Sequence, residues 1–499
     1  MSLSMRAAPA ILNSTMMVEG EALPRGNVEH SLLERLAQAL EDQGLRYCQW
    51  KGHWSAHRWS AGRGDVDLLV DHDSNAEFRR LVGELGFKPA LPAGARQIPG
   101  IESYYGYDPA VPRLLHLHVH YRLVVGDFWR TTYRIPIERA MLETSGPGTL
   151  FRVPDPTFQY VVFVLRMMLL QRGRPLLAVG ARWRRSIQIQ LDNLEGLTER
   201  QGLSTVLGRH LSAIDLPFFD RCVASLRGEA GALERALLPD QLHARLRPYA
   251  RRPPIAALLT AAADRLLPVE LRRMLADERM RPAAGGTVVA LVGGDGAGKS
   301  TAATELSNWL GTDFAATRGH LGNPPRSLFT LAIGGLLKAE QQLNRILRPV
   351  ARPASYLGLL RYLCTARDCY LLHERLRRFA AEGGVAICER YPVPQMRSHV
   401  GPCIPDLLPA QPTRLAKKLE AMEAGYYGRI QAPDALLVLR LDPELAVLRK
   451  PDEPADYVRA RGRAVWDTDW AGTPAHCVDT SRPLPEVLLD LKALVWSAL

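Results

Sequence analysis

The hydrophobic and polar positions of residues 27–150 follow two different periods. In residues 27–45, apolar side chains recur every three or four positions, which predicts a helix that stops near Gly44. A second helix is predicted over residues 74–87. Shorter runs are typical of strands, namely RYCQW, GDVDLLV, ESYYGY and LLHLHVHYRL. Helices placed between antiparallel-type strands predict a small α+β domain.

The pattern changes twice after residue 150. Strand signals disappear, and amphipathic runs predict helices, for instance TFQYVVFVLRMMLLQ and LLTAAADRLLPVELRRMLADE. The proline and glycines of ERMRPAAGG then favour a boundary. Strands and helices alternate after it, which predicts an α/β domain with a parallel sheet. The first residues lack any pattern and are expected to form a disordered lead. The expected divisions are 1–26, 27–150, 151–284 and 285–499.

Charge and cysteine content narrow the class of protein. The 499 residues carry a formal net charge of +11 at pH 7, which suits a phosphate-bearing partner and equally suits an arginine-rich composition. Seven cysteines without a CxxC pair indicate reduced thiols and a cytoplasmic protein. No pattern typical of base stacking or base reading supports nucleic acid as a partner. A homodimer stays open.

The sequence predicts no membrane span. A basic-then-apolar signal pattern is absent from the N-terminus, and no apolar run has the length of a span. The nearest candidate is SLFTLAIGGLL at 327–337. We expect it to be a buried helix, with contact to a membrane surface as the alternative.

Residues 287–301, TVVALVGGDGAGKST, carry the chemistry of polyphosphate binding. They fit the pattern G-x-x-x-x-G-K-[ST] between an apolar strand and a helix. Glycines let the backbone N–H groups surround phosphates at the positive end of a helix. Lys299 is expected to reach the β and γ phosphates, and Ser300 to hold Mg²⁺. We therefore expect ATP, or another nucleoside triphosphate, on Gly293, Gly294, Gly296, Ala297, Gly298, Lys299, Ser300 and Thr301.

A second candidate lies in GGVAICERYP, where an apolar strand ends in a charged pair. The carboxylate of Glu389 could hold a magnesium-bound water or accept a proton from the phosphate acceptor. The neighbouring Arg390 could bind a phosphoryl group during transfer. The alternative is a surface ion pair at the end of a strand.

A basic segment follows the next predicted strand. RKPDEPADYVRARGRAVW breaks the preceding helix with prolines and presents several arginines. A basic lid over a phosphate site excludes water and adds positive charge, so we assign Arg449 and Arg459 to ATP binding. The alternative is a solvated basic helix.

These features occur in an order that resembles one family. GGDGAGKST, ERY, LDPELA and the basic segment look like the thymidylate kinase family of P-loop nucleotide kinases, over roughly residues 286–499. The resemblance implies a five-stranded parallel sheet, MgATP as donor and a small phosphate acceptor. Asp295 matches an acidic residue in the family's loop. Glu389 and Arg390 match its Asp-Arg pair, whose arginine contacts the acceptor phosphate. The implied catalytic residues are Lys299, Glu389, Arg390 and Asp295.

The expected acceptor site departs from that family. In place of its Arg-Glu-Pro segment the chain has TRGHLGNPPRS, where Arg318 is a polar candidate. The family also has a helix before the Glu-Arg pair, on which an aromatic residue and an arginine hold thymidylate. RYLCTARDCYLLHERLRRF lies at that place with its register shifted by about one residue. Arg367 is our candidate for this arginine, and Cys369 occupies the competing position. The substrate-binding candidates are therefore Arg318, Arg367 and Arg390. We expect a kinase for a nucleotide or another small phosphorylated or hydroxylated acceptor, and not for thymidylate.

The front part of the chain holds another pair of carboxylates. In GDVDLLV, strand geometry places Asp65 and Asp67 on one face, close enough to share a divalent metal. The upstream turn Lys51-Gly52-His53 could approach a phosphate. Together these features resemble the nucleotidyltransferase superfamily that includes DNA polymerase beta, over roughly residues 27–150. The alternative is a solvated acidic start of a strand.

The resemblance implies a third carboxylate on a neighbouring strand, but the strand at that place, LLHLHVHYRL, contains no Asp or Glu. Its alternating histidines at 116, 118 and 120 share one face, and they fit either metal ligands or a solvated surface. We therefore expect a second divalent metal on Asp65, Asp67 and His118, besides Mg²⁺ on Ser300. The whole chain is then a kinase fused to a nucleotidyltransferase-like domain. The alternative is a nucleotide-sensing regulatory protein with a non-catalytic front domain.

Overall fold

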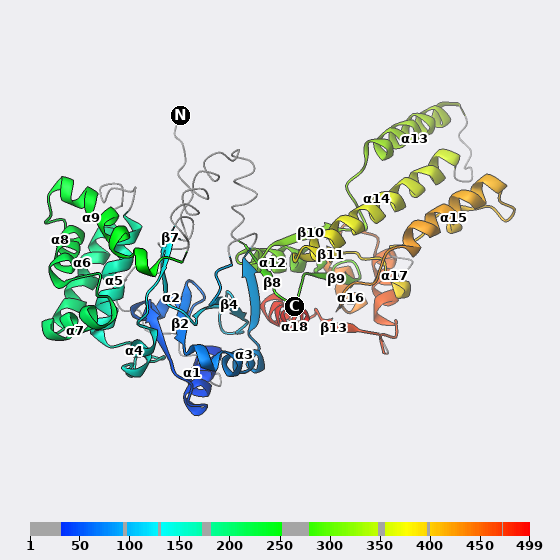
Figure 1. The fold of residues 1–499 in the computed structure, drawn as a ribbon. Helices are drawn as coiled ribbons and strands as arrows, with labels where there is room; N and C mark the ends of the chain where they lie inside the picture. The colour runs from blue at the N-terminus through cyan, green and yellow to red at the C-terminus, as the bar shows by residue number, and fades with distance from the viewer. Residues whose placement is uncertain are drawn as a thin grey trace. The chain divides into compact units, whose positions relative to one another are not determined.

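The computed structural model describes residues 31–92, 97–127, 131–171, 181–251, 279–347, 355–396, 400–471 and 473–499. The chain has a mixed α/β fold and divides into two compact units, which we call unit 1 (residues 1–278) and unit 2 (residues 279–499) (Figure 1). Two predictions lie outside the described residues: the disordered lead of residues 1–26 and the helix of LLTAAADRLLPVELRRMLADE.

Unit 1 begins with helices packed on a mixed sheet. Its strands pair in the order β1-β2-β5-β4-β3, and β2 and β5 run parallel while the other pairs are antiparallel. The expectation of antiparallel strands is therefore wrong for β2 and β5, because α3 and two further strands separate them in sequence. The strands are β1 (Tyr47–Lys51), β2 (Asp65–Val70), β3 (Lys88–Pro92), β4 (Ile101–Gly106) and β5 (Leu115–His120).

The two predicted helices of this region are present as α1 (Leu32–Asp42) and α3 (Asn75–Glu84). The Ser31 hydroxyl accepts a hydrogen bond from the backbone N–H of Glu34, whose carboxylate accepts one from Ser31 N–H. This reciprocal cap satisfies two donors at the start of α1. Leucines of α1 and Phe78 of α3 are buried against the sheet, so both helices hold its strands in place. A turn of 3-10 helix (His53–Ser55) and the short helix α2 (Ala56–Trp59) lie between β1 and β2.

The helices predicted after residue 150 are confirmed in the described part of the chain. They surround α5, whose apolar residues are buried on almost every side. The same hydrophobic core includes Trp50 and Leu69 from the sheet, so helices and sheet share one interior. The elements are β6 (Val124–Asp127), β7 (Thr131–Arg134), α4 (Glu138–Glu143), α5 (Pro156–Leu170), α6 (Ala181–Gly196), α7 (Arg200–His210), α8 (Leu216–Arg227) and α9 (Ala232–Arg245).

Unit 2 contains the predicted parallel sheet. Five strands pair in the order β10-β11-β9-β12-β13, and every pair is parallel. The chain moves first to one side of β9 and then to the other, which leaves a crevice outside the carboxyl end of β9. The strands of this sheet are β9 (Thr287–Gly293), β10 (Ala316–His320), β11 (Val385–Glu389), β12 (Ala435–Arg440) and β13 (Ala475–Asp479). The short strand β8 (Met280–Pro282) precedes them and is not part of it.

Helices connect the parallel strands of unit 2, and three of them extend away from the sheet: α13, α14 and α15 (Figure 1). The helices are α12 (Lys299–Gly311), α13 (Leu328–Leu347), α14 (Tyr356–Ala381), α15 (Arg414–Gly428), α16 (Pro443–Arg449), α17 (Ala455–Trp466) and α18 (Leu484–Ala498).

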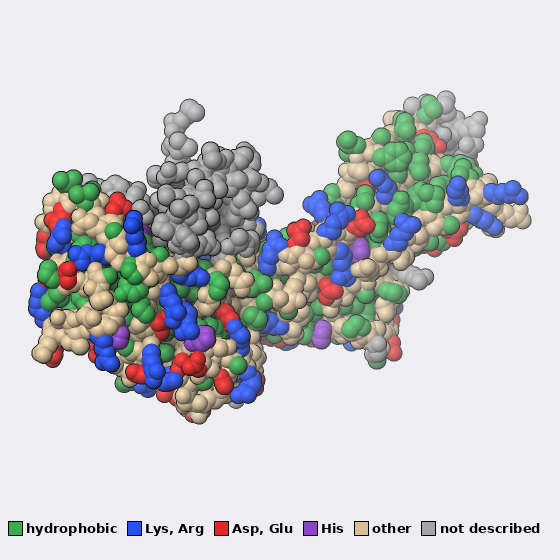
Figure 2. Space-filling model, viewed as in Figure 1, with side chains coloured by type: hydrophobic (Ala, Val, Ile, Leu, Met, Phe, Trp, Pro, Cys, Tyr) green, Lys and Arg blue, Asp and Glu red, His purple; other side chains and the backbone are tan. Residues whose placement is uncertain are grey.

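The expectation that SLFTLAIGGLL is a buried helix is wrong. It forms the first part of α13, and Leu328 is 86% exposed, while Phe329 and Leu336 are also exposed. Only one side of α13, including Ile333, is buried, because α14 is its main neighbour. Figure 2 shows hydrophobic side chains gathered over this part of unit 2. Among the described residues, no helix is long and apolar enough to cross a membrane.

Gly286, which directly precedes β9, has no room for a side chain. A Cβ atom there would overlap the carbonyl oxygens of Gly384 and Ala380. We expect Gly286→Ala to cost about 1–3 kcal/mol, as overpacking does. The matched control is Gly311→Ala, because a Cβ at Gly311 meets open space. Calorimetric melting of the full chain should show a lower transition for the first variant alone, and equal transitions would contradict this packing.

Candidate functional site

The glycine loop of unit 2 follows directly from its central strand. β9 is buried along its whole length and ends at Gly293, and α12 begins at Lys299. Gly296 and Gly298 both have φ of +81°, a left-handed conformation that glycine adopts without steric cost. A Cβ on Gly293 would lie 2.7 Å from the carbonyl oxygen of Leu439. The motif glycines are therefore required by backbone conformation and by close approach.

Lys299 is folded back over the loop. Its ammonium donates a hydrogen bond to the carbonyl oxygen of Gly294 at 2.5 Å, and the residue is only 7% exposed. Burial lowers the pKa of Lys299 to about 8, and the neighbouring positive charge of Arg390 acts in the same direction. This buried positive charge at the start of α12 favours binding of a negatively charged ligand.

Glu389 lies beside the loop because β11 pairs with β9. The parallel register sets Glu389 opposite Leu291, and the carboxylate is almost fully buried. One carboxylate oxygen accepts a hydrogen bond from the Ser300 hydroxyl at 2.5 Å, and the other lies 2.8 Å from an Arg318 guanidinium nitrogen. The predicted residues Ser300, Glu389 and Arg318 are thus brought together. A hydroxyl oxygen and a carboxylate oxygen held side by side are suitable ligands for Mg²⁺.

Asp295 joins two arginines from distant parts of unit 2. Its two carboxylate oxygens lie 2.9 Å from an Arg390 nitrogen and 2.8 Å from an Arg461 nitrogen. Arg390 has φ of +50°, a conformation that costs free energy in a residue with a side chain. Three cationic side chains from different elements, those of Lys299, Arg390 and Arg461, therefore lie around the Asp295 carboxylate of the loop.

The basic segment contributes a residue that the sequence analysis did not assign. Arg461 of α17 contacts Asp295, whereas the assigned Arg459 pairs with Glu444 and Asp456. A sequence signal exists in two glycines: a Cβ on Gly294 would lie 3.1 Å from the Cα of Gly462, so its absence lets α17 approach the loop, and a Cβ on Gly462 would lie 3.3 Å from Pro443 of α16. The assigned Arg449 donates a hydrogen bond to the carbonyl oxygen of Thr480 at 3.0 Å.

A small pocket adjoins the loop, lined by Val292, Gly293, Lys299, Arg390, Tyr391, Met396, Val400 and Arg461. The predicted candidate Arg367 does not line it. Arg367 lies on α14, where it is half-buried. Cys369, at the competing position, is fully buried in the core beside the sheet. Ala297 and Thr301 complete the loop, the former buried and the latter exposed.

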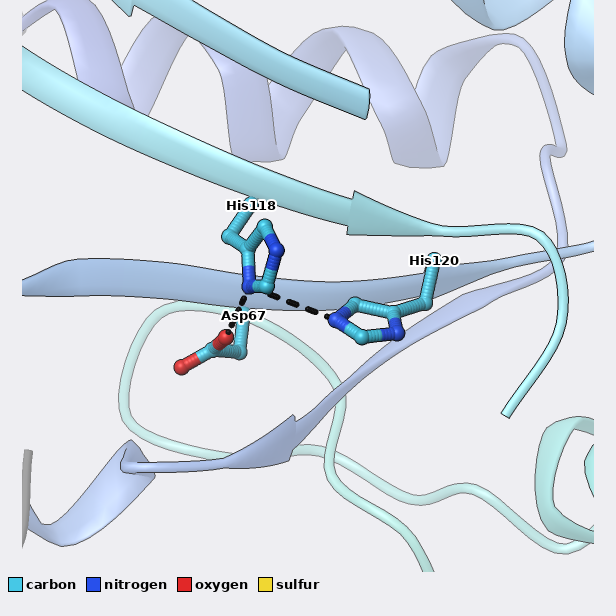
Figure 3. A group of neighbouring side chains, drawn as sticks. All are labelled: Asp67, His118 and His120. Atoms are coloured by element: carbon cyan, nitrogen blue, oxygen red, sulfur yellow. Dashed lines mark hydrogen bonds and ion pairs between the residues drawn. The ribbon is translucent and has the colours of Figure 1, made fainter. Parts of the chain in front are cut away.

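Unit 1 holds the second predicted group. The parallel register pairs Asp65 with His116 and Asp67 with His118, so the predicted common face is confirmed. The Nδ1 atom of His116 lies 2.7 Å from an Asp65 oxygen, and that of His118 lies 2.9 Å from an Asp67 oxygen. His120 Nε2 lies 3.3 Å from His118 Nδ1 (Figure 3). Asp67, His118 and His120 form a possible metal-ligand cluster, which contains two of the three predicted ligands.

Charge around this cluster is balanced by basic groups. The Lys51 ammonium lies 2.8 Å from Asp67, at the turn that the sequence analysis selected. Burial opposes the ionisation of Asp67, yet Lys51 and His118 hold its pKa below the ordinary value. Burial lowers the pKa of His120 well below its ordinary value, with the charge of His118 acting in the same direction. The buried carboxylate therefore stays ionised beside a neutral imidazole.

No protein-family model matches the chain, and no curated protein matches it.

Removing the charge of Asp295 should destabilise unit 2. Asp295→Asn leaves Arg390 and Arg461 without their counter-charge beside Lys299. Because both arginines are partly exposed, we expect a loss below the roughly 3–5 kcal/mol that breaking a fully buried pair costs. The matched control is Asp456→Asn, since Asp456 is fully exposed and pairs with Arg459 on the surface. Such surface pairs contribute little to stability, because solvent and salt screen them. Calorimetric melting of both variants decides the matter, and similar losses would show that Asp295 has no special role.

Proposed function

We propose that unit 2 is an MgATP-dependent phosphotransferase that acts on a nucleotide or another small phosphorylated or hydroxylated acceptor. The observation that carries this proposal is the glycine loop at the carboxyl end of β9, with Lys299 and Ser300 at the start of α12. Backbone N–H groups, a buried ammonium and the positive end of a helix suit a polyphosphate. The resemblance to thymidylate kinases in the sequence agrees with this chemistry.

Mg²⁺ would be held by Ser300 with Glu389. Their side-chain oxygens lie 2.5 Å apart and face each other, and hydroxyl and carboxylate oxygens are the ligands that Mg²⁺ takes in such sites. The ion would neutralise charge on the transferred phosphoryl group. Glu389 is also anchored by Arg318, which fixes the carboxylate at the end of β11.

The acceptor would enter beside Arg390. This residue lines the pocket next to Tyr391 and Met396, and it can release Asp295 to contact a phosphoryl group. Arg461 and Lys299 add two further positive charges at the same place. Concentrated positive charge in a partly dry site stabilises the negative charge that develops during phosphoryl transfer.

A nucleotide-sensing regulatory protein would need the same loop but no turnover. The closely placed Ser300, Glu389 and Arg390 favour the enzyme, because a sensor requires only binding. Product formation from MgATP with nucleotides, nucleosides and sugar phosphates as acceptors separates the two functions.

Lys299→Ala should abolish ATP turnover by the full chain, because the ammonium is the group placed against the phosphates. Losses of this kind usually amount to about 100-fold or more. Lys338→Ala is the matched control, since Lys338 is exposed on α13. Turnover is measured as ADP release with each candidate acceptor. Unchanged turnover in the Lys299 variant would contradict the assignment of the loop.

Nucleotide binding should be coupled to proton uptake at alkaline pH. With a pKa of about 8, a substantial part of Lys299 is neutral at pH 8.5, and bound phosphate favours its charged form. Binding should therefore take up a fraction of a proton at pH 8.5 and almost none at pH 6.5, where Lys299 is already charged.

Calorimetric titration with MgATP in two buffers of different ionisation enthalpy measures this uptake. Lys299→Arg is the control, because arginine stays charged at both pH values and should show none. Equal uptake by this variant and by the natural chain would assign the proton to another group.

A further inference from the structure

Three metal-ligating side chains of unit 1 point toward one another across neighbouring strands. Asp67 lies on β2, and His118 and His120 lie on β5 (Figure 3). The candidate ligand atoms of all three lie within 4.8 Å of one another. Because the register of two parallel strands fixes these positions, the cluster is built into the sheet and does not depend on a loop.

Two of the three ligand pairs have the spacing expected around a tetrahedral ion. Zinc bonds to nitrogen and oxygen are about 2.0–2.2 Å long, so neighbouring ligand atoms around a tetrahedral ion lie roughly 3.3 Å apart. His118 Nδ1 is 3.3 Å from His120 Nε2 and 2.9 Å from Asp67 Oδ1. Small side-chain rotations would therefore seat one ion between these atoms.

The hydrogen bonds of the cluster are incomplete without a further positive group. His118 Nδ1 faces both His120 Nε2 and Asp67, and it can carry one proton at most. Asp67 is fully buried, and its Oδ2 atom has no hydrogen-bond partner among the described residues. A buried oxygen left unpaired is costly, and a small rotation of the Asp67 side chain would turn Oδ2 toward an ion between the two imidazoles.

The ligand set differs from the one expected from the sequence. Asp65 was expected to bind the metal, but it contacts His116, whose ring stacks on Tyr105 at 4.4 Å between centroids. His120 takes its place, held edge-on against Trp50 at 4.9 Å. Asp65 and His116 thus form a neighbouring pair outside the cluster.

We propose that Asp67, His118 and His120 form a binding site for one divalent transition metal of the zinc class. Two imidazoles and one carboxylate suit Zn²⁺, Co²⁺ or Ni²⁺, whereas Mg²⁺ and Ca²⁺ prefer all-oxygen sites. Three protein ligands leave a fourth position for water or a substrate oxygen. The side chain of His118 is 19% exposed, which opens the cluster to solvent.

Lys51 neutralises the Asp67 carboxylate while no ion is bound. Its ammonium lies 2.8 Å from the same Asp67 oxygen that faces His118, so it supplies positive charge where the ion would sit. The ion would displace the ammonium from this carboxylate oxygen. A Cβ on Gly52 would lie 3.9 Å from Asp67 Oδ2, so the backbone passes close to the carboxylate without a side chain between them. A freed lysine at this place would attract an anionic ligand oxygen.

The test is a Co²⁺ titration of the full chain after removal of metals by a chelator. A tetrahedral Co²⁺ site gives strong visible absorption, which the six-oxygen environment of Co²⁺ at a magnesium site does not. We expect this absorption in the natural chain. His120→Gln and Asp67→Asn should weaken Co²⁺ binding by more than the roughly 10–100-fold that loss of an outer partner costs.

The matched control is Asp65→Asn, which should change Co²⁺ affinity by less than tenfold. Circular dichroism verifies that each variant is folded, and the absorption of the natural chain decides the existence of the site even where a variant fails to fold. Absence of tetrahedral absorption in the natural chain overturns the proposal. Loss of binding in Asp65→Asn with retention in His120→Gln would also overturn it, in favour of a carboxylate pair. Lys299→Ala should leave the spectrum unchanged, so the outcome is independent of the phosphate loop.

Discussion

The parallel pairing of β9 with β11 is the constraint on which the candidate phosphate site depends. Parallel strands end at the same edge of a sheet, and here the register places Glu389 beside the start of the glycine loop. The backbone N–H of Arg390 then donates to the carbonyl oxygen of Leu291, which fixes the turn after β11. Ser300 and Glu389, 89 positions apart in the chain, meet only because of this register.

A comparable constraint governs unit 1. β2 and β5 are also parallel, and their alignment pairs each aspartate with a histidine. In both units, strand register determines where the carboxylate and imidazole groups lie, and the surrounding helices bury the strands and fix their positions. Buried strand positions are rigid, which favours precise placement of carboxylates and imidazoles.

Local features of both sites could be predicted from the sequence, since they depend on short spacings. The loop, the Glu389–Arg390 pair and the common face of Asp65 and Asp67 need only strand periodicity and the phosphate motif. The parallel sheet of unit 2 was equally accessible from the alternation of strands and helices. Contacts between distant segments could not be predicted from the sequence. The meeting of Arg461 with Asp295, and the replacement of Asp65 by His120 in the cluster, depend on tertiary packing that no spacing encodes. The exposure of α13 was missed for the same reason, because an apolar run does not say whether a neighbour covers it.

Asp295 also acts as an internal competitor for the loop's own cations. Its carboxylate is tethered within reach of Arg390 and Arg461, so its local concentration there greatly exceeds that of a free anion in solution. A ligand with a single negative charge can exchange with one of these contacts but gains little from doing so. A ligand with several charges can replace both contacts and also engage the Lys299 ammonium, which is now held by a backbone carbonyl. If the loop binds MgATP as proposed, these contacts would set a charge threshold that separates polyphosphates from the abundant small monoanions of a cell.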